Sequence, residues 1–392
     1  MPSSPVRPSA RASRRARRVV RPATALAAAA LAAGVVAGCG SDDGGGASGS
    51  GGGGLKVVAT TAQMGDLVRE VGGDAVDVHQ VLQASTDPHE YEPRPTDVTE
   101  TAKAKIVFAS GLGLDAWIGD VVKQSGADAT VVEVGDGVPT KLEGGHSHDH
   151  AHEDEAAHED EHAHEDEDEA GHDHAHEDEA RHADETAAND EAATEEAEHD
   201  HASEDGTDPH WWHDPKNVAA AVGVVRDALV KAEPAAKTEI EKSAAAYLAK
   251  VQALDTAIEA CVGAVPKADR KLVTSHDAFG YFAHRYDITV VGATIPSQTT
   301  QAQPSAGDVD RLTKQIRAEG VKAIFPESSV NPKLSRAIAK ETGARADLTL
   351  YGDALGEPGT PGATYLGMER ANANAVVEGF TGKKDACGAA SR

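Results

Sequence analysis

The sequence feature that most limits the fold is an uninterrupted helical pattern from Pro234 to Cys261. After its first residue this stretch contains neither glycine nor proline. Apolar side chains recur mostly three or four residues apart, at Ile240, Ala244, Tyr247, Leu248, Val251, Leu254 and Ile258. This spacing places them on one face of a helix, whose first turn tolerates a proline. We therefore predict one rigid helix of about 25 residues, about 40 Å long, that links the parts of the chain on either side.

The residues before and after this helix alternate short β-branched runs with helical patterns, which predicts an α/β fold with parallel sheets. The predicted strands before the helix are Leu55–Ala59, Val76–Leu82, Lys105–Ala109 and Thr130–Val134. Those after it are Lys271–Thr274, Ile288–Val291, Ala323–Phe325 and Asp347–Leu350. We expect a first lobe over 55–140 that ends at 208–233, a linking helix over 234–264, a second lobe over 265–382 and a tail over 383–392.

Residues 1–38 have the pattern of an export signal, with seven arginines followed by an apolar run. The run is too short for a permanent membrane helix. It ends in Val36-Ala37-Gly38-Cys39, which resembles a bacterial lipobox, so we expect Cys39 to carry lipid. A cysteine that merely follows an ordinary cleavage site is the alternative. Residues 39–54 are nearly all Gly, Ser and Asp and predict a flexible tether at the extracytoplasmic face of the membrane.

Two further cysteines, Cys261 and Cys387, remain in the exported part of the chain. An oxidising compartment allows such a pair to form a disulfide. Because two cysteines alone fix no geometry, two free thiols are the alternative.

The segment from His146 to Asp205 is of low complexity and carries most of the charge. The formal net charge of the chain is −28, and this segment holds 26 acidic residues against one arginine. It has no aromatic residue, so it cannot bury a core, and we expect residues 141–207 to be a disordered insertion in the first lobe. No basic patch occurs elsewhere, so we expect no nucleic-acid partner.

Thirteen of the nineteen histidines lie in this segment, many of them two residues apart. The closest groups are His148, His150 and His152, and His172, His174 and His176. Neighbouring imidazoles can chelate one ion, and the surrounding carboxylates attract divalent cations. A solvated acidic spacer would explain the acids but not the histidines. We expect weak metal binding, since a disordered ligand must be ordered on binding.

Three of the other six histidines and one aspartate follow predicted strands or precede helices, where α/β proteins build binding sites. They are His89, His210, His276 and Asp353. A proline directly before His89 and His210 stiffens the backbone there. Three neutral imidazoles and one carboxylate form a four-coordinate set that Zn²⁺ accepts tetrahedrally. We predict one zinc site from these residues.

Other polar residues in the predicted lobes receive different interpretations. Glu327 ends a predicted strand, where it could orient a ligand histidine or only pack. We expect His79 to be structural and His284 to face solvent or pack. His213 could bind metal transiently, but a surface role is our prediction.

These stretches resemble the ABC-transporter solute-binding proteins for zinc and manganese, the family of high-affinity zinc-uptake binding proteins. The likeness covers nearly all of Leu55–Phe380, and its motifs lie at 87–93, 208–215, 274–286 and 325–329, with Asp353 beyond them. It implies two (βα)₄-like lobes joined by one long helix, with the metal held between them by His89, His210, His276 and Asp353. Manganese-type members tend to have a carboxylate in place of His276. The resemblance therefore implies Zn²⁺ as the transported ligand, with Mn²⁺ as the alternative.

The resemblance also implies an ABC permease and its ATPase subunit as partners, membrane contact through the lipid anchor, and a monomer. No phosphate-binding glycine loop occurs, so ATP use would belong to the partners. A zinc hydrolase is a rival function, but Asp353 would close the coordination position that catalysis needs, and no His-Glu-x-x-His helix is present. A metal buffer or adhesin that serves no transporter is the other rival.

Overall fold

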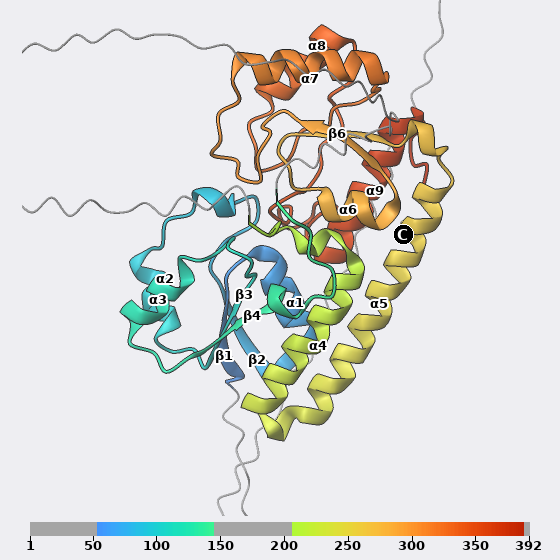
Figure 1. Cartoon of the computed structure of the whole chain (residues 1–392). Helices are drawn as coiled ribbons and strands as arrows, with labels where there is room; N and C mark the ends of the chain where they lie inside the picture. Colours follow the sequence, from blue (N-terminus) through green and yellow to red (C-terminus); the bar gives the residue numbers. More distant parts are fainter. Residues whose placement is uncertain (1–52, 145–205, 388–392) are drawn as a thin grey trace, which may run out of the picture. The chain divides into compact units, whose positions relative to one another are not determined.

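A computed structural model describes residues 53–144 and 206–387 (Figure 1). The predicted export signal, Cys39, most of the tether and the histidine-rich segment lie outside the described residues. Within the described ranges, no helix combines the length and the apolar character needed to cross a membrane.

The first lobe is built on a parallel four-stranded sheet of order β2-β1-β3-β4. Its strands are β1 (Leu55–Ala59), β2 (Val76–Gln80), β3 (Ile106–Ala109) and β4 (Thr130–Glu133). Successive side chains of a strand point to opposite faces. Val57 and Phe108 accordingly belong to the main core, whereas Val58 and Val107 belong to a separate cluster on the other face. The central strand β3 is buried on both faces, as is typical of parallel sheets, whereas the edge strand β4 is largely exposed.

Helix α1 (Ala62–Gly72) supplies Leu67 and Val68 to the main core, and α3 (Ile118–Ser125) supplies Ile118 and Val121 to the other cluster. Helix α2 (Pro95–Thr101) packs beside α3. Short 3-10 turns complete this lobe: η1 (Gly73–Ala75), η2 (Pro88–Glu90), η3 (Val134–Gly137) and η4 (Trp211–His213).

The linking helix is α5 (Lys237–Gly263), whose 27 residues span about 40 Å at 1.5 Å per residue. It runs beside α4 (Pro215–Ala232) and packs on α1 of the first lobe and on α6 and α9 of the second (Figure 1). All the predicted apolar positions except the half-buried Leu248 are fully buried. The helix begins later than predicted because Pro234 lies in a 3-10 turn, η5 (Pro234–Ala236), which Glu233 and Ala236 close by a hydrogen bond of 3.1 Å.

The second lobe contains β5 (Lys271–Thr274) paired in parallel with β6 (Thr289–Ala293). Its helices are α6 (Gly280–Tyr286), α7 (Ala306–Glu319), α8 (Lys333–Thr342) and α9 (Tyr365–Thr381), and η6 (Lys267–Asp269) precedes β5. The predicted α/β fold with parallel sheets is confirmed.

Two predicted strands of the second lobe, Ala323–Phe325 and Asp347–Leu350, are wrong as regular strands. They form only isolated parallel bridges, such as Thr274 with Phe325 and Glu327 with Leu350. Pro326 interrupts the ladder because it has no N–H to donate. Its carbonyl still accepts from the amide of Leu350 at 2.9 Å, so the segment continues the sheet irregularly.

Two further connections fix the chain around the lobes. A disulfide joins Cys261 on α5 to Cys387 beyond α9. The described residues on either side of the histidine-rich segment lie together, because Gly144 donates to the carbonyl of Gly206 at 2.6 Å. The chain therefore returns to the lobe close to where it left it.

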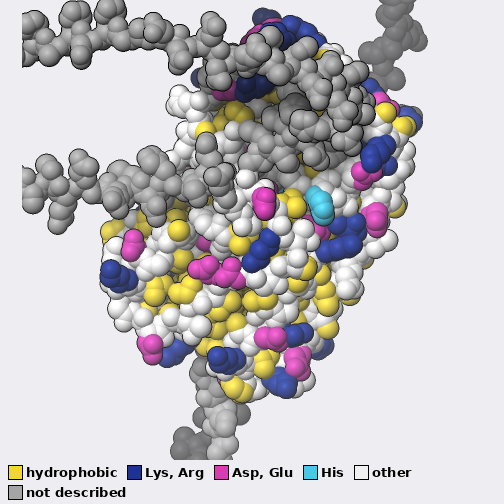
Figure 2. Space-filling view, in the orientation of Figure 1, with side chains coloured by type: hydrophobic (Ala, Val, Ile, Leu, Met, Phe, Trp, Pro, Cys, Tyr) yellow, Lys and Arg dark blue, Asp and Glu magenta, His cyan; other side chains and the backbone are white. Residues whose placement is uncertain are grey.

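The described surface mixes charges of both signs. On the face shown in Figure 2, basic and acidic side chains are interspersed over the first lobe and the linking helix. Exposed ion pairs such as Lys56 with Asp77 at 2.8 Å and Lys103 with Glu100 at 2.7 Å bring opposite charges together. Pairs of this kind contribute little to stability.

Candidate metal site

His210, the first of the predicted ligands that we describe, precedes the turn η4. The carboxylate of Asp208 accepts the backbone N–H of His210 at 2.9 Å and lies 2.7 Å from its Nδ1. An Nδ1–H donated to a carboxylate leaves Nε2 free to bind a metal. The side chain of His210 is fully buried, so this orientation is fixed.

His276 lies two residues after the end of β5 and is held in a similar way from another segment. Glu327 accepts the backbone N–H of His276 at 2.9 Å, and its second oxygen lies 2.8 Å from the Nδ1 of the ring. Glu327 approaches so closely that a Cβ on Gly352 would lie 2.4 Å from its carboxylate, which explains the glycine before Asp353. The structure thus places Glu327 where it can orient His276.

His89 lies in the short turn η2 and is the most accessible of the four, with its side chain 10% exposed. Asp87 caps the turn by accepting the backbone N–H of His89 at 2.9 Å. The amide side chain of Gln301, from the second lobe, donates to the carbonyl of His89. The ion pair of this ring joins Nε2 to Asp353, not Nδ1 to a neighbouring carboxylate.

Asp353 is the fourth member and lies in the loop after the irregular segment that ends at Leu350. Its backbone neighbour Gly352 accepts hydrogen bonds from Trp212 Nε1 at 3.2 Å and from Gln63 Nε2 at 3.5 Å. The carboxylate itself is fully buried, and the polar groups that it faces are the ring nitrogens of His276, His210 and His89. A buried carboxylate is costly unless cationic groups face it, and three imidazoles or a metal ion that they share can meet this need.

The four side chains converge on one point. The carboxylate oxygens of Asp353 lie 3.2 Å from His276 Nε2, 3.3 Å from His210 Nε2 and 3.7 Å from His89 Nε2. The Nε2 atoms of His276 and His210 lie 3.4 Å apart, and all four ligand atoms fall within 4.8 Å of one another. Two of the four residues come from each lobe.

The four groups titrate as a cluster. Burial disfavours a charge on His210, but the carboxylates of Asp208 and Asp353 outweigh it and raise its pKa to about 9. The pKa of His276 is likewise raised against burial, by Asp353 and Glu327. For His89 burial prevails and lowers the pKa to about 3. Burial also opposes the charge of Asp353, yet His276 and His210 hold its pKa well below the usual value.

Sequence reasoning missed one residue of this site and placed another wrongly. Asp208 was not predicted, although Asp-Pro-His at 208–210 repeats the tripeptide at 87–89 and could have indicated it. The surface role predicted for His213 is wrong, because this side chain is fully buried against Glu369. His79 lies in β2, 3.9 Å from Asp97, and His284 is exposed on α6.

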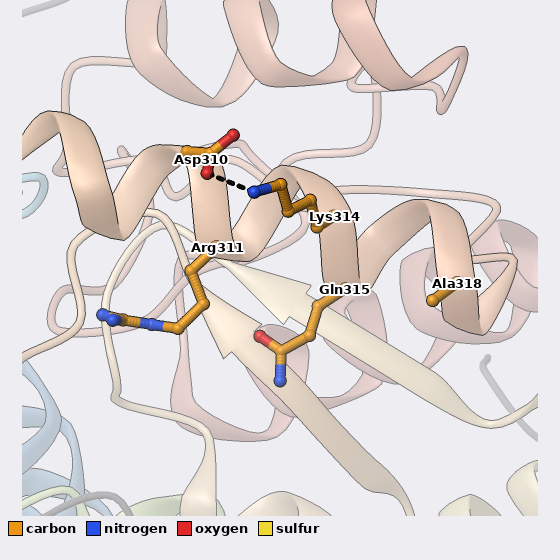
Figure 3. Close-up of a pocket in the computed structure, with 5 residues that line it drawn as sticks. All are labelled: Asp310, Arg311, Lys314, Gln315 and Ala318. Atoms are coloured by element: carbon orange, nitrogen blue, oxygen red, sulfur yellow. Dashed lines mark ion pairs between the residues drawn. The ribbon is translucent and has the colours of Figure 1, made fainter.

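A separate surface hollow lies on the outer side of the second lobe, and Figure 3 shows its five lining residues. All come from α7, and two of them, Asp310 and Lys314, pair at 2.7 Å one turn apart. The hollow contains none of the four convergent residues. It therefore has no part in the metal site.

Comparisons with known proteins agree with this geometry. Residues 57–379 match the family model described as zinc-uptake complex component A, periplasmic. The manganese-binding lipoprotein MntA of Halalkalibacterium halodurans is 27% identical over 345 residues, 88% of this chain and 94% of the relative. The iron ABC transporter substrate-binding lipoprotein MtsA of Streptococcus pyogenes is 25% identical over 333 residues, 83% of this chain and 89% of the relative.

Among solved structures, the periplasmic zinc-binding protein TroA of Treponema pallidum aligns with a TM-score of 0.64 at 25% identity. The alignment covers 84% of this chain and 99% of that chain. The fold and the buried His₃Asp cluster define the class: a substrate-binding component of a metal ABC importer, not an enzyme.

Within that class the chain belongs to the ZnuA family, the zinc-uptake complex component A, because the family match runs from β1 into α9. The resemblance inferred from the sequence motifs is therefore confirmed.

Proposed function

We propose that this chain captures Zn²⁺ with His89, His210, His276 and Asp353 and delivers it to the permease of an ABC importer. The observation that carries the proposal is the spacing of the ligand atoms, which lie 3.2 to 3.7 Å from Asp353 and 3.4 Å between two of the rings. A tetrahedral zinc ion with bonds of about 2.0–2.1 Å has ligands about 3.3 Å apart. Three nitrogen donors also favour zinc over manganese, which prefers oxygen ligands.

Manganese is the second candidate cargo, because the relative MntA is named for it, and MtsA is named for iron. A competition experiment distinguishes these metals. Purified protein is loaded with equal zinc and manganese, passed over a desalting column and analysed for metal. We expect one tight equivalent of zinc and at least about a tenfold preference over manganese, a difference of about 1.4 kcal/mol. A tight equivalent filled mainly by manganese would reject the zinc assignment.

The proposed location is the extracytoplasmic face of the cell membrane, with a lipid anchor at Cys39. The support is the lipobox-like sequence before Cys39 and the naming of relatives such as MntA as lipoproteins. The tether over 39–54 would let the protein reach the permease, whose ATPase subunit would drive transport. Cys39→Ala should free the protein from membranes, and unchanged membrane association of that variant would contradict the anchor.

The proposed role of the histidine-rich segment is to collect metal near the site. Its support is compositional: thirteen histidines among acidic residues, with the groups His148, His150 and His152, and His172, His174 and His176. The described residues at its two ends adjoin Asp208, which contacts His210. Zinc uptake by cells with and without this chain tests whether the captured ion is delivered to the importer or only buffered.

A further inference from the structure

Helix α9 carries three buried polar side chains along one face, Tyr365, Glu369 and Asn372. Positions four and three residues apart lie next to each other on a helix. Tyr365 is 2% exposed and the other two are fully buried. A buried polar group costs free energy unless it is paired, so the partners of these three residues indicate what they do.

Two of the three hold the turn η4 that follows His210. The hydroxyl of Tyr365 donates to the carbonyl of Trp212 at 3.0 Å. Glu369 Oε1 lies 2.7 Å from Nδ1 of His213, whose backbone N–H donates to the carbonyl of His210 at 3.3 Å. Helix α9 therefore fixes the backbone next to His210 at two points.

The ring of His213 also reaches the segment of another ligand. It stacks on Phe279 with 4.4 Å between ring centroids and an angle of 23° between the ring planes. Phe279 follows His276 by three residues at the start of α6. His213, paired with Glu369, thus contacts both the segment that carries His210 and the segment that carries His276.

Asn372 holds the loop of the fourth ligand. Its Oδ1 accepts the backbone N–H of Tyr351 at 2.9 Å, and its Nδ2 donates to the carbonyl of Tyr351 at 2.8 Å. Tyr351 stands two residues before Asp353. One face of α9 therefore hydrogen-bonds to the chain beside His210 and beside Asp353. The Nε2 of His210 and the Oδ1 of Asp353 lie 3.3 Å apart.

We propose that Tyr365, Glu369 and Asn372 are positioning residues, which set the separation of His210 from Asp353 and so the geometry of the bound ion. This inference rests on the metal site proposed above. A buried pair such as His213 and Glu369 is weak evidence for a role in stability, since its replacement by apolar side chains of similar volume is often neutral or stabilising. Mutation of groups that orient metal ligands typically weakens metal binding by about 10- to 100-fold.

The test uses the full chain and three variants. The double variant His213→Phe/Glu369→Leu replaces the pair with apolar side chains, and Tyr365→Phe removes one hydroxyl. Glu378→Gln is the matched control on the same helix, where Glu378 pairs with Arg345 at 3.2 Å away from the site. Three quantities are measured: zinc affinity by chelator competition, the visible d–d spectrum of the first equivalent of bound Co²⁺, and the melting temperature of metal-free protein.

We expect the double variant to melt within a few degrees of the parent, to bind zinc about 10- to 100-fold more weakly and to show a shifted Co²⁺ spectrum. Tyr365→Phe should shift the spectrum in the same direction with a smaller loss of affinity, and Glu378→Gln should match the parent.

Parent-like Co²⁺ spectra in the double variant and in Tyr365→Phe would overturn the inference, because α9 would then only pack. An affinity loss that follows a lower melting temperature, with an unchanged spectrum, would also overturn it. If the double variant does not fold, the spectrum of Tyr365→Phe decides alone. A parent protein without a tight zinc equivalent would instead reject the proposed metal site, so the two failures can be told apart.

Discussion

The tripeptide Asp-Pro-His occurs at residues 87–89 and at 208–210, and its two copies hold their histidines differently. In both, the aspartate accepts the backbone N–H of the histidine at 2.9 Å. Only Asp208 also reaches the ring, 2.7 Å from Nδ1 of His210, which is fully buried. His89 is 10% exposed and has its ion pair at Nε2. The same local sequence thus forms the same turn, but tertiary packing decides whether the ring is held in advance.

Replacing each histidine by alanine should show the largest difference in zinc affinity between the two turns. His210→Ala should weaken zinc binding by at least about 100-fold, or about 2.7 kcal/mol, because it leaves a gap that solvent does not reach. His89→Ala should cost less, about tenfold or somewhat more, because a water molecule can take the accessible fourth position, as in three-ligand zinc sites. Competition titration with a zinc chelator measures both. Equal losses, or a larger loss for His89→Ala, would contradict the distinction between the buried His210 and the more accessible His89.

Replacing the aspartate of each tripeptide by asparagine should change zinc affinity differently at the two turns, without removing a predicted ligand. Asp208→Asn keeps an oxygen for the backbone N–H of His210 but removes the charge beside Nδ1, and should weaken zinc binding about 10- to 100-fold. Asp87→Asn is the matched control, because Asp87 caps the turn of His89 without pairing with its ring. We expect its affinity to stay within about twofold, or about 0.4 kcal/mol, of the parent. The same loss of zinc affinity in both variants would show that the two aspartates act only by capping their turns, and that Asp208 does not act through the ring of His210.

Sequence patterns predicted the elements that local residues determine. The strands of the first lobe follow β-branched runs, and α5 follows its apolar spacing, so both were placed within a few residues. The structure also brings together the four residues predicted as ligands, two from each lobe, all in segments that follow strands or precede helices. The second sheet was less predictable, since Pro326 breaks its ladder.

Partners from distant segments could not be predicted in this way. His213 was expected at the surface, yet Glu369, 156 residues further along the chain, buries it. The role of Asp208 depends on the direction of one side chain, which the tripeptide shared with Asp87 does not determine. Such details follow from packing between lobes, for which local periodicity carries no information.

The histidines of the two turns should also differ in how they make stability and zinc affinity depend on pH. The pKa of His210 is raised from 6.5 to about 9, so its charge stabilises the metal-free protein below pH 6.5, and this stabilisation is lost as the pH rises through 9. Zinc binding must displace that proton, so His210 alone should raise the affinity by up to about tenfold per pH unit over this range. His276, whose pKa is also raised, adds to this dependence. His89, with a pKa of about 3, is already neutral and contributes no such dependence.

Melting temperatures with and without zinc, at about pH 6.5, 7.5 and 9, check this expectation, since the first and last values bracket the shift of His210. The stabilisation by zinc should grow with pH in the parent and grow less in Asp208→Asn. A gap that stays constant from pH 6.5 to 9 would contradict the raised pKa.

Deleting the histidine-rich segment should have the smallest effect on the site, although the segment adjoins the second turn. Because Gly144 and Gly206 are hydrogen-bonded, a short Gly/Ser join can replace residues 145–205. Calorimetry should find one tight zinc equivalent within about twofold of the parent affinity and no weaker equivalents. Loss of the tight equivalent would mean that the segment supplies a primary ligand, and unchanged stoichiometry would mean that it is only a spacer.

The central claim is that one ion is bound by three imidazoles and one carboxylate between the lobes. X-ray absorption spectroscopy at the zinc edge tests it most directly, on the deletion protein loaded with one equivalent so that the segment adds no signal. We expect four nitrogen or oxygen ligands at about 2.0–2.1 Å, with the outer-shell scattering of three imidazoles, and of two imidazoles in His276→Ala. A six-coordinate oxygen shell, or a parent spectrum with fewer than three imidazoles, would contradict it.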